Sequence, residues 1–149
     1  MYPDRTVATF INENFEPVRV HVREQRDEFQ RLGARYNAQW TPTILLIDSE
    51  GEERHRIEGF LPKDEFLPQL ELGLAKSAFA HGSFSEAERR YRAIVDRYPQ
   101  TDAAPEAQYW AGVSKYKTTG DAKALAETAG AFRERYQDST WAKKASVWG

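Results

Sequence analysis

The chain has 149 residues, enough for one ordinary domain or two small ones. Hydrophobic residues make up 40% of it and charged residues 30%, proportions typical of a soluble globular protein. The formal net charge is −2, and neither half has the basic excess that a nucleic-acid-binding surface needs. No apolar run approaches the roughly 18 residues of a membrane span. We therefore expect no nucleic-acid partner and no membrane insertion.

The first part of the chain alternates helical and strand patterns. Apolar residues at i, i+3 and i+4 predict helices, and strict alternation predicts a strand. Asp4 is of a type that caps helix N-termini. The predicted elements are a helix from Asp4 to about Asn14, a strand at Val18–Val22 and a helix at Gln25–Tyr36.

A β-hairpin is predicted next. Ile44–Ile47 is a continuous apolar run, typical of a strand that is buried on both faces. Asp48–Gly51 has the composition of a tight turn. Residues Glu53–Phe60 alternate in the manner of an edge strand. The predicted order is therefore α, β, α, β, β.

Beyond Lys63 only helices are predicted. The first runs from Glu65 to His81, with Pro68 in its first turn and a buried side formed by Phe66, Leu70, Leu74 and Phe79. A capping box of Ser85 and Glu88 predicts the start of the second, which ends at Tyr98. The remaining helices are expected at Pro105–Thr119, at Lys123–Tyr136 and from about Thr140.

The helical part contains an internal repeat. A shift of about 38 positions brings glycine onto glycine at a helix break and aromatic residues onto aromatic residues. Stacked helix pairs need such a repeat, because one pair cannot bury its apolar face alone. The matched pairs are Gly82 and Gly120, Arg97 and Arg135, Tyr98 and Tyr136, Ala107 and Ala145, and Trp110 and Trp148.

The segment Trp40-Thr41-Pro42-Thr43, which precedes the apolar strand, carries a family resemblance together with the Asp48–Gly51 turn and Gly59-Phe60. Residues of about 4–75 resemble the later part of the thioredoxin fold. The resemblance implies that the Thr41–Pro42 peptide bond is cis. It also implies that the backbone beside this proline pairs with a bound polypeptide or a substrate thiol.

The sequence departs from that family in its chemistry. It contains no cysteine, so thiol–disulfide exchange, thiolate catalysis and zinc–thiolate sites are excluded for the chain as given. In the family, a central strand and its Cys-x-x-Cys would lie before Met1. Three explanations stay open: the chain is a trimmed piece of a longer protein, the sheet re-pairs, or a second molecule supplies a strand.

Residues of about 66–148 resemble tetratricopeptide repeats. Ala107-Gln108-Tyr109-Trp110-Ala111-Gly112 and Gly120-Asp121 carry this resemblance. It implies binding of other proteins in a groove between helices. The polar faces around Arg89, Arg92, Lys115 and Lys117 are candidates to line a groove for an acidic peptide. The aromatic residues of these helices are expected in the helix–helix core instead: Tyr109, Trp110, Tyr116, Tyr136, Trp141 and Trp148.

The sequence thus predicts an incomplete α/β thioredoxin-like domain at residues 1–75, followed by all-α tetratricopeptide-like repeats at 66–149 that share the linking helix. We expect no catalytic residue, no metal site and no cofactor. Trp40, Thr41, Pro42 and Thr43 are the candidate polypeptide-binding residues, although Trp40 could equally pack against the helix before it.

The expected function is non-catalytic protein–protein interaction, with a protein or peptide as partner. A homodimer in which a second copy supplies the missing strand is one form of it. The alternative is a fragment of a thiol–disulfide oxidoreductase whose cysteines lie upstream of Met1. We expect a cytoplasmic location, or a periplasmic one if a signal peptide was removed.

Overall fold

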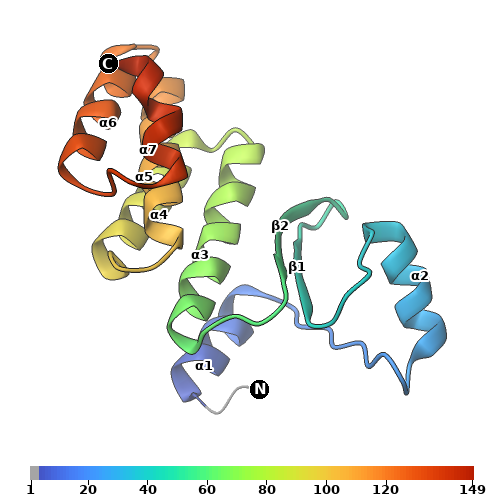
Figure 1. The fold of residues 1–149 in the computed structure, drawn as a ribbon. Coiled ribbons are helices and arrows are strands. Elements are labelled where there is room, and N and C mark those ends of the chain that lie inside the picture. The colour runs from blue at the N-terminus through green and yellow to red at the C-terminus, as the bar shows by residue number, and fades with distance from the viewer. Residues whose placement is uncertain (1–3) are drawn as a thin grey trace. The chain divides into compact units, whose positions relative to one another are not determined.

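The structure is a computed structural model, and it describes residues 4–149 (Figure 1). The chain divides into two compact units, residues 1–43 and residues 44–149. The first unit contributes two helices, and the second contributes a β-hairpin followed by helices. The division falls at the start of the hairpin, whereas the domain limits expected from the sequence, 1–75 and 66–149, stay a prediction.

Two helices in the first unit confirm the local sequence signals. Helix α1 spans Arg5–Asn14, and its N-cap, Asp4, accepts a hydrogen bond of 2.9 Å from the Thr6 backbone N–H. Helix α2 spans Arg26–Tyr36 and ends at Asn37, which adopts the left-handed conformation common after a helix C-terminus.

The predicted strand at Val18–Val22 is wrong. Among the described residues only two strands form a sheet, and this segment is not one of them. Val18 is 83% exposed, and local bonds at His21 and Gln25 turn the chain into α2. Alternating hydrophobicity favours a strand only where another strand can pair its backbone groups. The observed order therefore begins α, α, β, β.

The predicted hairpin is confirmed in the second unit, as strands β1 (Thr43–Ile47) and β2 (Glu53–Glu58). The Asp48 N–H donates to the Glu52 carbonyl at 2.9 Å and the Gly51 N–H to the Asp48 carbonyl at 3.0 Å, which closes the turn. The expectation that β1 is buried on both faces is wrong, because Leu46 is buried but Ile47 is 41% exposed. Helix α3 covers the Leu46 side, where Leu46 lies against Gly73.

Helix α3 spans Lys63–Ala80 and packs against both β2 and the following helices. The predicted buried side was too narrow: Leu70 is buried, but so are Leu72, Ala75 and Ala78, because the helix is covered on more than one side. The helix also begins earlier than expected. Pro68 therefore lies inside it, beyond the first turn.

The other helices lie close to their predicted ranges. They are α4 (Phe84–Arg97), α5 (Ala103–Thr119), α6 (Lys123–Glu134) and α7 (Thr140–Ala145), with a short 3₁₀ turn at Ser146–Trp148. The predicted capping box is wrong, because α4 begins at Phe84 and Ser85 lies inside it. The main core is formed between α3, α4 and α5 around Leu72, Tyr91 and Ile94. No helix among residues 4–149 is long and apolar enough to cross a membrane.

Candidate functional site

The candidate segment Trp40–Thr43 follows α2 in the first unit. Trp40 is 64% exposed, so this large aromatic residue is accessible to solvent. The Thr43 hydroxyl donates to the Trp40 carbonyl at 2.6 Å, a bond that spans Thr41 and Pro42. The Thr41–Pro42 peptide bond is cis. The segment thus offers an exposed aromatic side chain beside a turn that is closed by an internal hydrogen bond.

In the second unit, a half-buried chain of polar side chains joins the hairpin to the helices. His55 Nε2 lies 2.7 Å from Gln69 Oε1, and its Nδ1 lies 3.1 Å from Lys76 Nζ. Lysine can only donate, so Nδ1 accepts and the ring carries its proton on Nε2. Burial lowers the pKa of the His55 ring below its usual value, and the Lys76 ammonium acts in the same direction. Lys76 is paired in turn with Glu106 of α5 at 2.8 Å.

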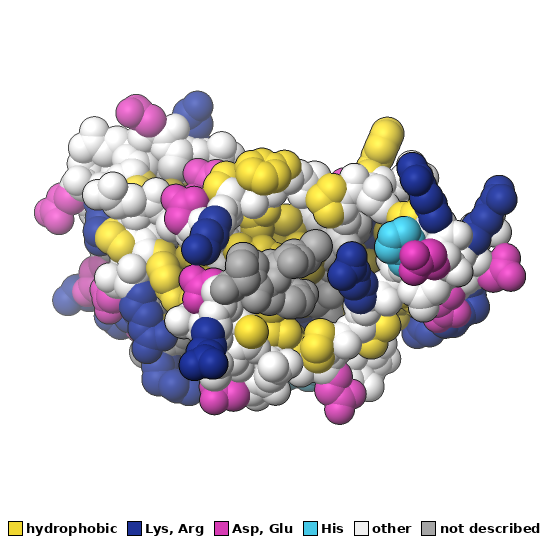
Figure 2. Space-filling model, turned by 90° about the horizontal axis from the view of Figure 1, so that it is seen from below, with side chains coloured by type: hydrophobic (Ala, Val, Ile, Leu, Met, Phe, Trp, Pro, Cys, Tyr) yellow, Lys and Arg dark blue, Asp and Glu magenta, His cyan; other side chains and the backbone are white. Residues whose placement is uncertain are grey.

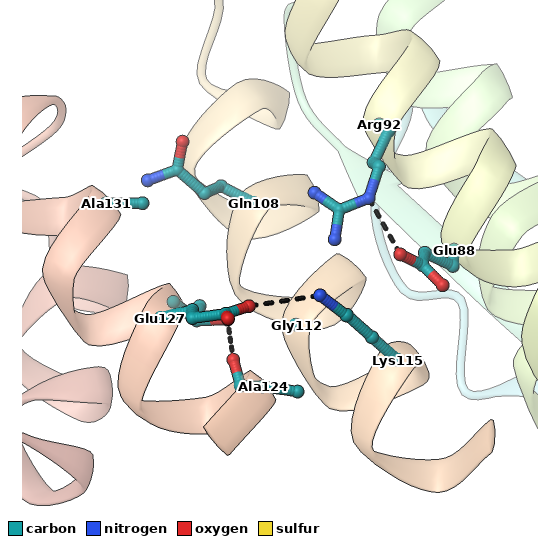
Figure 3. A pocket seen from close by; sticks show the side chains of 9 residues that line it. Glu88, Arg92, Gln108, Gly112, Lys115, Ala124, Glu127 and Ala131 are labelled. Atoms are coloured by element: carbon teal, nitrogen blue, oxygen red, sulfur yellow. Dashed lines mark hydrogen bonds and ion pairs between the residues drawn. The ribbon is translucent and has the colours of Figure 1, made fainter. Parts of the chain in front are cut away.

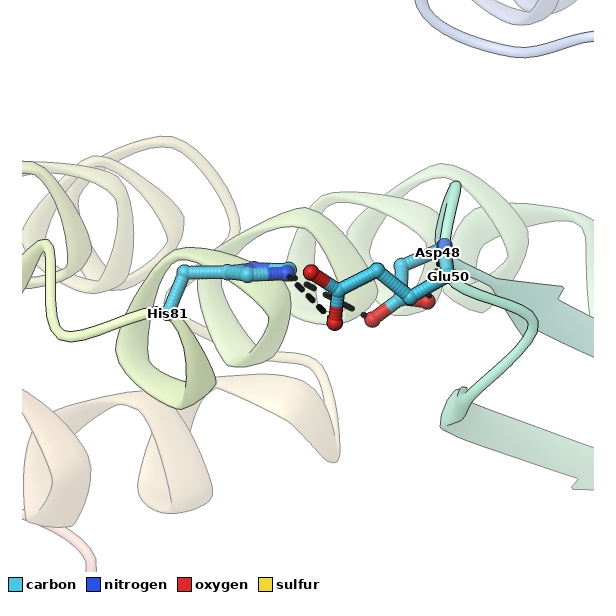
Figure 4. Close-up of side chains that lie close together, drawn as sticks. All are labelled: Asp48, Glu50 and His81. Carbon is cyan, nitrogen blue, oxygen red and sulfur yellow. Dashed lines mark hydrogen bonds and ion pairs between the residues drawn. The ribbon is translucent and has the colours of Figure 1, made fainter.

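The turn of the hairpin meets the end of α3 at a second cluster, formed by Asp48, Glu50 and His81 (Figure 4). His81 Nδ1 donates to the Ser77 carbonyl at 2.7 Å, which turns Nε2 toward Asp48 Oδ2 at 3.6 Å. Oxygen and imidazole ligands of this kind suit a divalent cation. A metal ion at this cluster would compete with the bonds that the Asp48 carboxylate already makes.

Those bonds leave Asp48 little capacity for a metal ion. Its Oδ1 accepts the backbone N–H groups of Glu50 and Glu52, each at 2.9 Å, and its Oδ2 accepts Arg54 Nε at 2.7 Å. The Glu52 bond is the main cause that holds the pKa of this carboxyl below its ordinary value. The Arg54 guanidinium already supplies a positive charge there. The cluster therefore fits a structural role in fixing the turn.

A cleft of about 450 Å³ lies between α4, α5 and α6 (Figure 3). Two ion pairs line it: Arg92 Nε donates to Glu88 at 2.8 Å, and Lys115 Nζ donates to Glu127 at 3.0 Å. Gln108 Nε2 is buried without a hydrogen-bond partner. Because the charges cancel and this amide lacks an acceptor, the cleft suits a neutral polar group such as a peptide carbonyl.

Two of the four predicted groove residues line this cleft, namely Arg92 and Lys115. Arg89 instead lies outside it, with its side chain 74% exposed and near Glu86, and Lys117 is exposed. The expected acidic peptide gains no support from the charges, because each cation in the cleft already has a carboxylate partner. On the face shown in Figure 2, acidic and basic side chains of the described residues are interspersed.

Four of the six aromatic side chains that were expected in the core pack against one another, namely Tyr109, Trp110, Trp141 and Trp148. Tyr109 stacks on Trp148 with ring centroids 4.8 Å apart, and it contacts Trp141 at 5.2 Å. Trp110 meets Phe79 of α3 edge to face at 5.2 Å. These rings are half-buried and join successive helices. They are accounted for by packing.

Sequence reasoning missed the His55–Lys76–Glu106 chain, the Asp48–His81 approach and the unpartnered amide of Gln108. The residues of each group are far apart in the sequence, and none forms a motif. One signal was present in β2, where His55 alternates with charged residues. A histidine is an unusual residue on the face of a hairpin that a helix covers. That signal alone does not identify its partners.

The comparisons with known proteins bear on the first part of the chain. No curated protein and no solved structure matches the sequence. Residues 3–73 match the family model described as a thioredoxin-like domain. This range contains Trp40, Thr41, Pro42 and Thr43 as well as the hairpin. A thioredoxin-like domain is therefore present at residues 3–73 of this cysteine-free chain.

Proposed function

We propose that this chain is a non-catalytic protein–protein interaction module. One observation carries the proposal: Trp40 is 64% exposed beside Thr41 and Pro42, in a domain of a redox fold that has no cysteine. Exposed tryptophans dominate binding energies at protein interfaces, since one ring buries a large apolar area at low entropic cost. Without a thiol this edge can hold a polypeptide but cannot exchange a disulfide with it.

We further propose that the helices form tetratricopeptide-like repeats that provide a second contact surface. The 38-residue shift superposes the range of α3 on that of α5 and the range of α4 on that of α6. Gly82 and Gly120, which the shift pairs, both have positive φ angles, of 78° and 70°. The buried and unpartnered Gln108 amide makes the cleft between α4, α5 and α6 the preferred contact on this surface.

The alternative function is that of the substrate-positioning part of a thiol–disulfide oxidoreductase. The match of residues 3–73 to a thioredoxin-like domain favours it. The coding sequence upstream of Met1 separates the two functions. An in-frame strand followed by Cys-x-x-Cys would favour the oxidoreductase, and a genuine start codon at Met1 would rule it out.

The interaction proposal is tested by capture of partners on the immobilised full chain. We compare wild type with Trp40→Ala and with Phe60→Ala, a control that removes another large ring, one that is 87% exposed. Trp40→Ala should lose specific partners that Phe60→Ala retains, and both should unfold at the wild-type urea concentration. Equal capture by all three proteins would reject Trp40 as a contact.

The cleft is tested separately with Gln108→Met, which keeps the length of the side chain but removes its polar atoms. We expect loss of a subset of the captured proteins. Arg89→Ala, on the neighbouring helix α4 but outside the cleft, is the matched control. If both variants capture the same proteins as wild type, the cleft is not a contact surface.

A further inference from the structure

The two edges of the hairpin differ sharply in chemistry. Among the described residues, β1 pairs with β2 alone, so each strand has one edge without a strand neighbour. Strand β2 has the sequence Glu-Arg-His-Arg-Ile-Glu, and charged side chains of this kind protect an edge from pairing with other chains. Strand β1 has the sequence Thr-Ile-Leu-Leu-Ile, with neither a charge nor a proline. Only β1 has the composition of an edge that accepts another strand.

The turn shows which backbone groups of β1 face this edge. The Asp48 N–H donates across the hairpin to Glu52. Backbone N–H and C=O groups of successive residues alternate in direction along a strand, so Leu46 and Ile44 also point toward β2. Thr43, Leu45 and Ile47 therefore present their backbone groups at the outer edge.

We propose that the outer edge of β1 pairs with β1 of a second copy of this chain, in an antiparallel and symmetric manner. In the antiparallel register centred on Leu45, Ile44 of each copy lies opposite Leu46 of the other, so apolar side chains meet along the middle of both strands. A twofold axis at Leu45 places Leu45 opposite its own counterpart and Thr43 opposite Ile47. All outward groups of both strands then pair, with about six hydrogen bonds.

Symmetry and charge explain why the assembly would stop at two copies. In a register centred on one residue, that residue lies opposite its own counterpart, and opposed side chains share a face of the sheet. Both α3 helices therefore lie on the same face of the new sheet. A register centred between two residues would place them on opposite faces. The resulting order is β2, β1, β1, β2, and both new outer edges belong to β2. Their charged side chains disfavour further addition. The two hairpins together form a four-stranded sheet whose two outer edges are charged.

The pairing also accounts for the exposure of Ile47, an apolar side chain that is 41% exposed. Side chains of adjacent strands pack on the same face, so Ile47 of one copy would cover Thr43 of the other. This inference goes beyond the proposed interaction function, because it uses neither Trp40 nor the cleft.

The first test is the oligomeric state of the full chain, measured by sedimentation velocity over a wide range of concentration. Ile47→Pro removes an outward N–H from each copy without removing a bond to β2, and it should weaken the dimer by roughly thirtyfold or more. Glu53→Pro is the matched control, because Glu53 follows Glu52 and presents its N–H at the outer edge of β2. It should leave the dimer unchanged. A chain that is monomeric throughout, or a dimer that survives Ile47→Pro, would overturn the proposal.

The second test examines the register and does not depend on proline. Leu45→Lys and Leu45→Glu each place like charges directly opposite one another, and each protein alone should be monomeric. Mixing the two should restore a dimer that contains one copy of each, while the Trp40→Ala change should leave this dimer intact. If the mixture stays monomeric although both proteins are folded by circular dichroism, pairing about Leu45 is wrong.

Discussion

Helix α5 lies close against Thr128 of α6 at Gly112, and this contact predicts a large effect of a single methyl group. A Cβ atom built on Gly112 would lie 1.9 Å from Thr128 Oγ1 and 2.7 Å from both Cβ and Cγ2 of the same residue. Carbon atoms in normal contact are ~3.5–4.0 Å apart. Rotation of the Thr128 side chain cannot relieve the overlap, because its Cβ is fixed to the backbone. Gly112→Ala must therefore push the two helices apart.

The magnitude follows from two opposing effects. Overpacking of this kind costs about 1–3 kcal/mol, and a contact with a rigid atom favours the upper end of that range. Alanine is also a better helix former than glycine by about 1 kcal/mol. We expect Gly112→Ala to lower the free energy of unfolding by about 2 kcal/mol. With a typical urea dependence, the midpoint should fall by about 1 M.

The assay is urea unfolding followed by circular dichroism and tryptophan fluorescence. Gly130→Ala in α6 is the matched control, because nothing lies within 4 Å of a Cβ built there. It should stabilise the protein by roughly 0.5–1 kcal/mol. In the double variant, Thr128→Gly removes all three contact atoms and should recover at least ~1 kcal/mol relative to the sum of the single effects. A Gly112→Ala midpoint at or above that of wild type would refute the reasoning.

Three further predictions concern bonds that hold the second unit together. The pKa of His55 is lowered in the folded protein from its usual 6.5. As the pH falls, the imidazole is therefore protonated in the unfolded chain before it is protonated in the folded one. The free energy of unfolding should then fall as the pH drops below about 6.5. His55→Gln should show a weaker loss of stability between neutral and mildly acidic pH, and identical pH profiles would contradict this. Ser139→Ala removes the cap that accepts the Ala142 N–H at 3.1 Å and should cost about 1 kcal/mol, with faster amide exchange confined to α7. Tyr136→Phe removes the hydroxyl that donates to the Pro99 carbonyl at 2.5 Å. It should lower the free energy of unfolding by about 1 kcal/mol in the same urea assay. An unchanged midpoint would show that water replaces this bond.

The sequence by itself determined the elements whose signals are local. Asp4 caps α1 as its residue type predicts, and the Asp48–Gly51 turn closes the hairpin. Glycine at position 120 ends α5 in the left-handed conformation. Each of these outcomes depends on bonds within a few residues, so a short window of sequence contains the necessary information.

Only the tertiary structure decided which patterns acquire a partner. Val18–Val22 has the alternation of a strand but pairs with none among the described residues, and the apolar run of β1 keeps one side partly exposed. The joining of His55 to Lys76 and Glu106, and the approach of His81 to Asp48, connect residues far apart in the chain. Periodicity reports that a side chain prefers burial or pairing, but which group supplies it depends on the packing of distant segments.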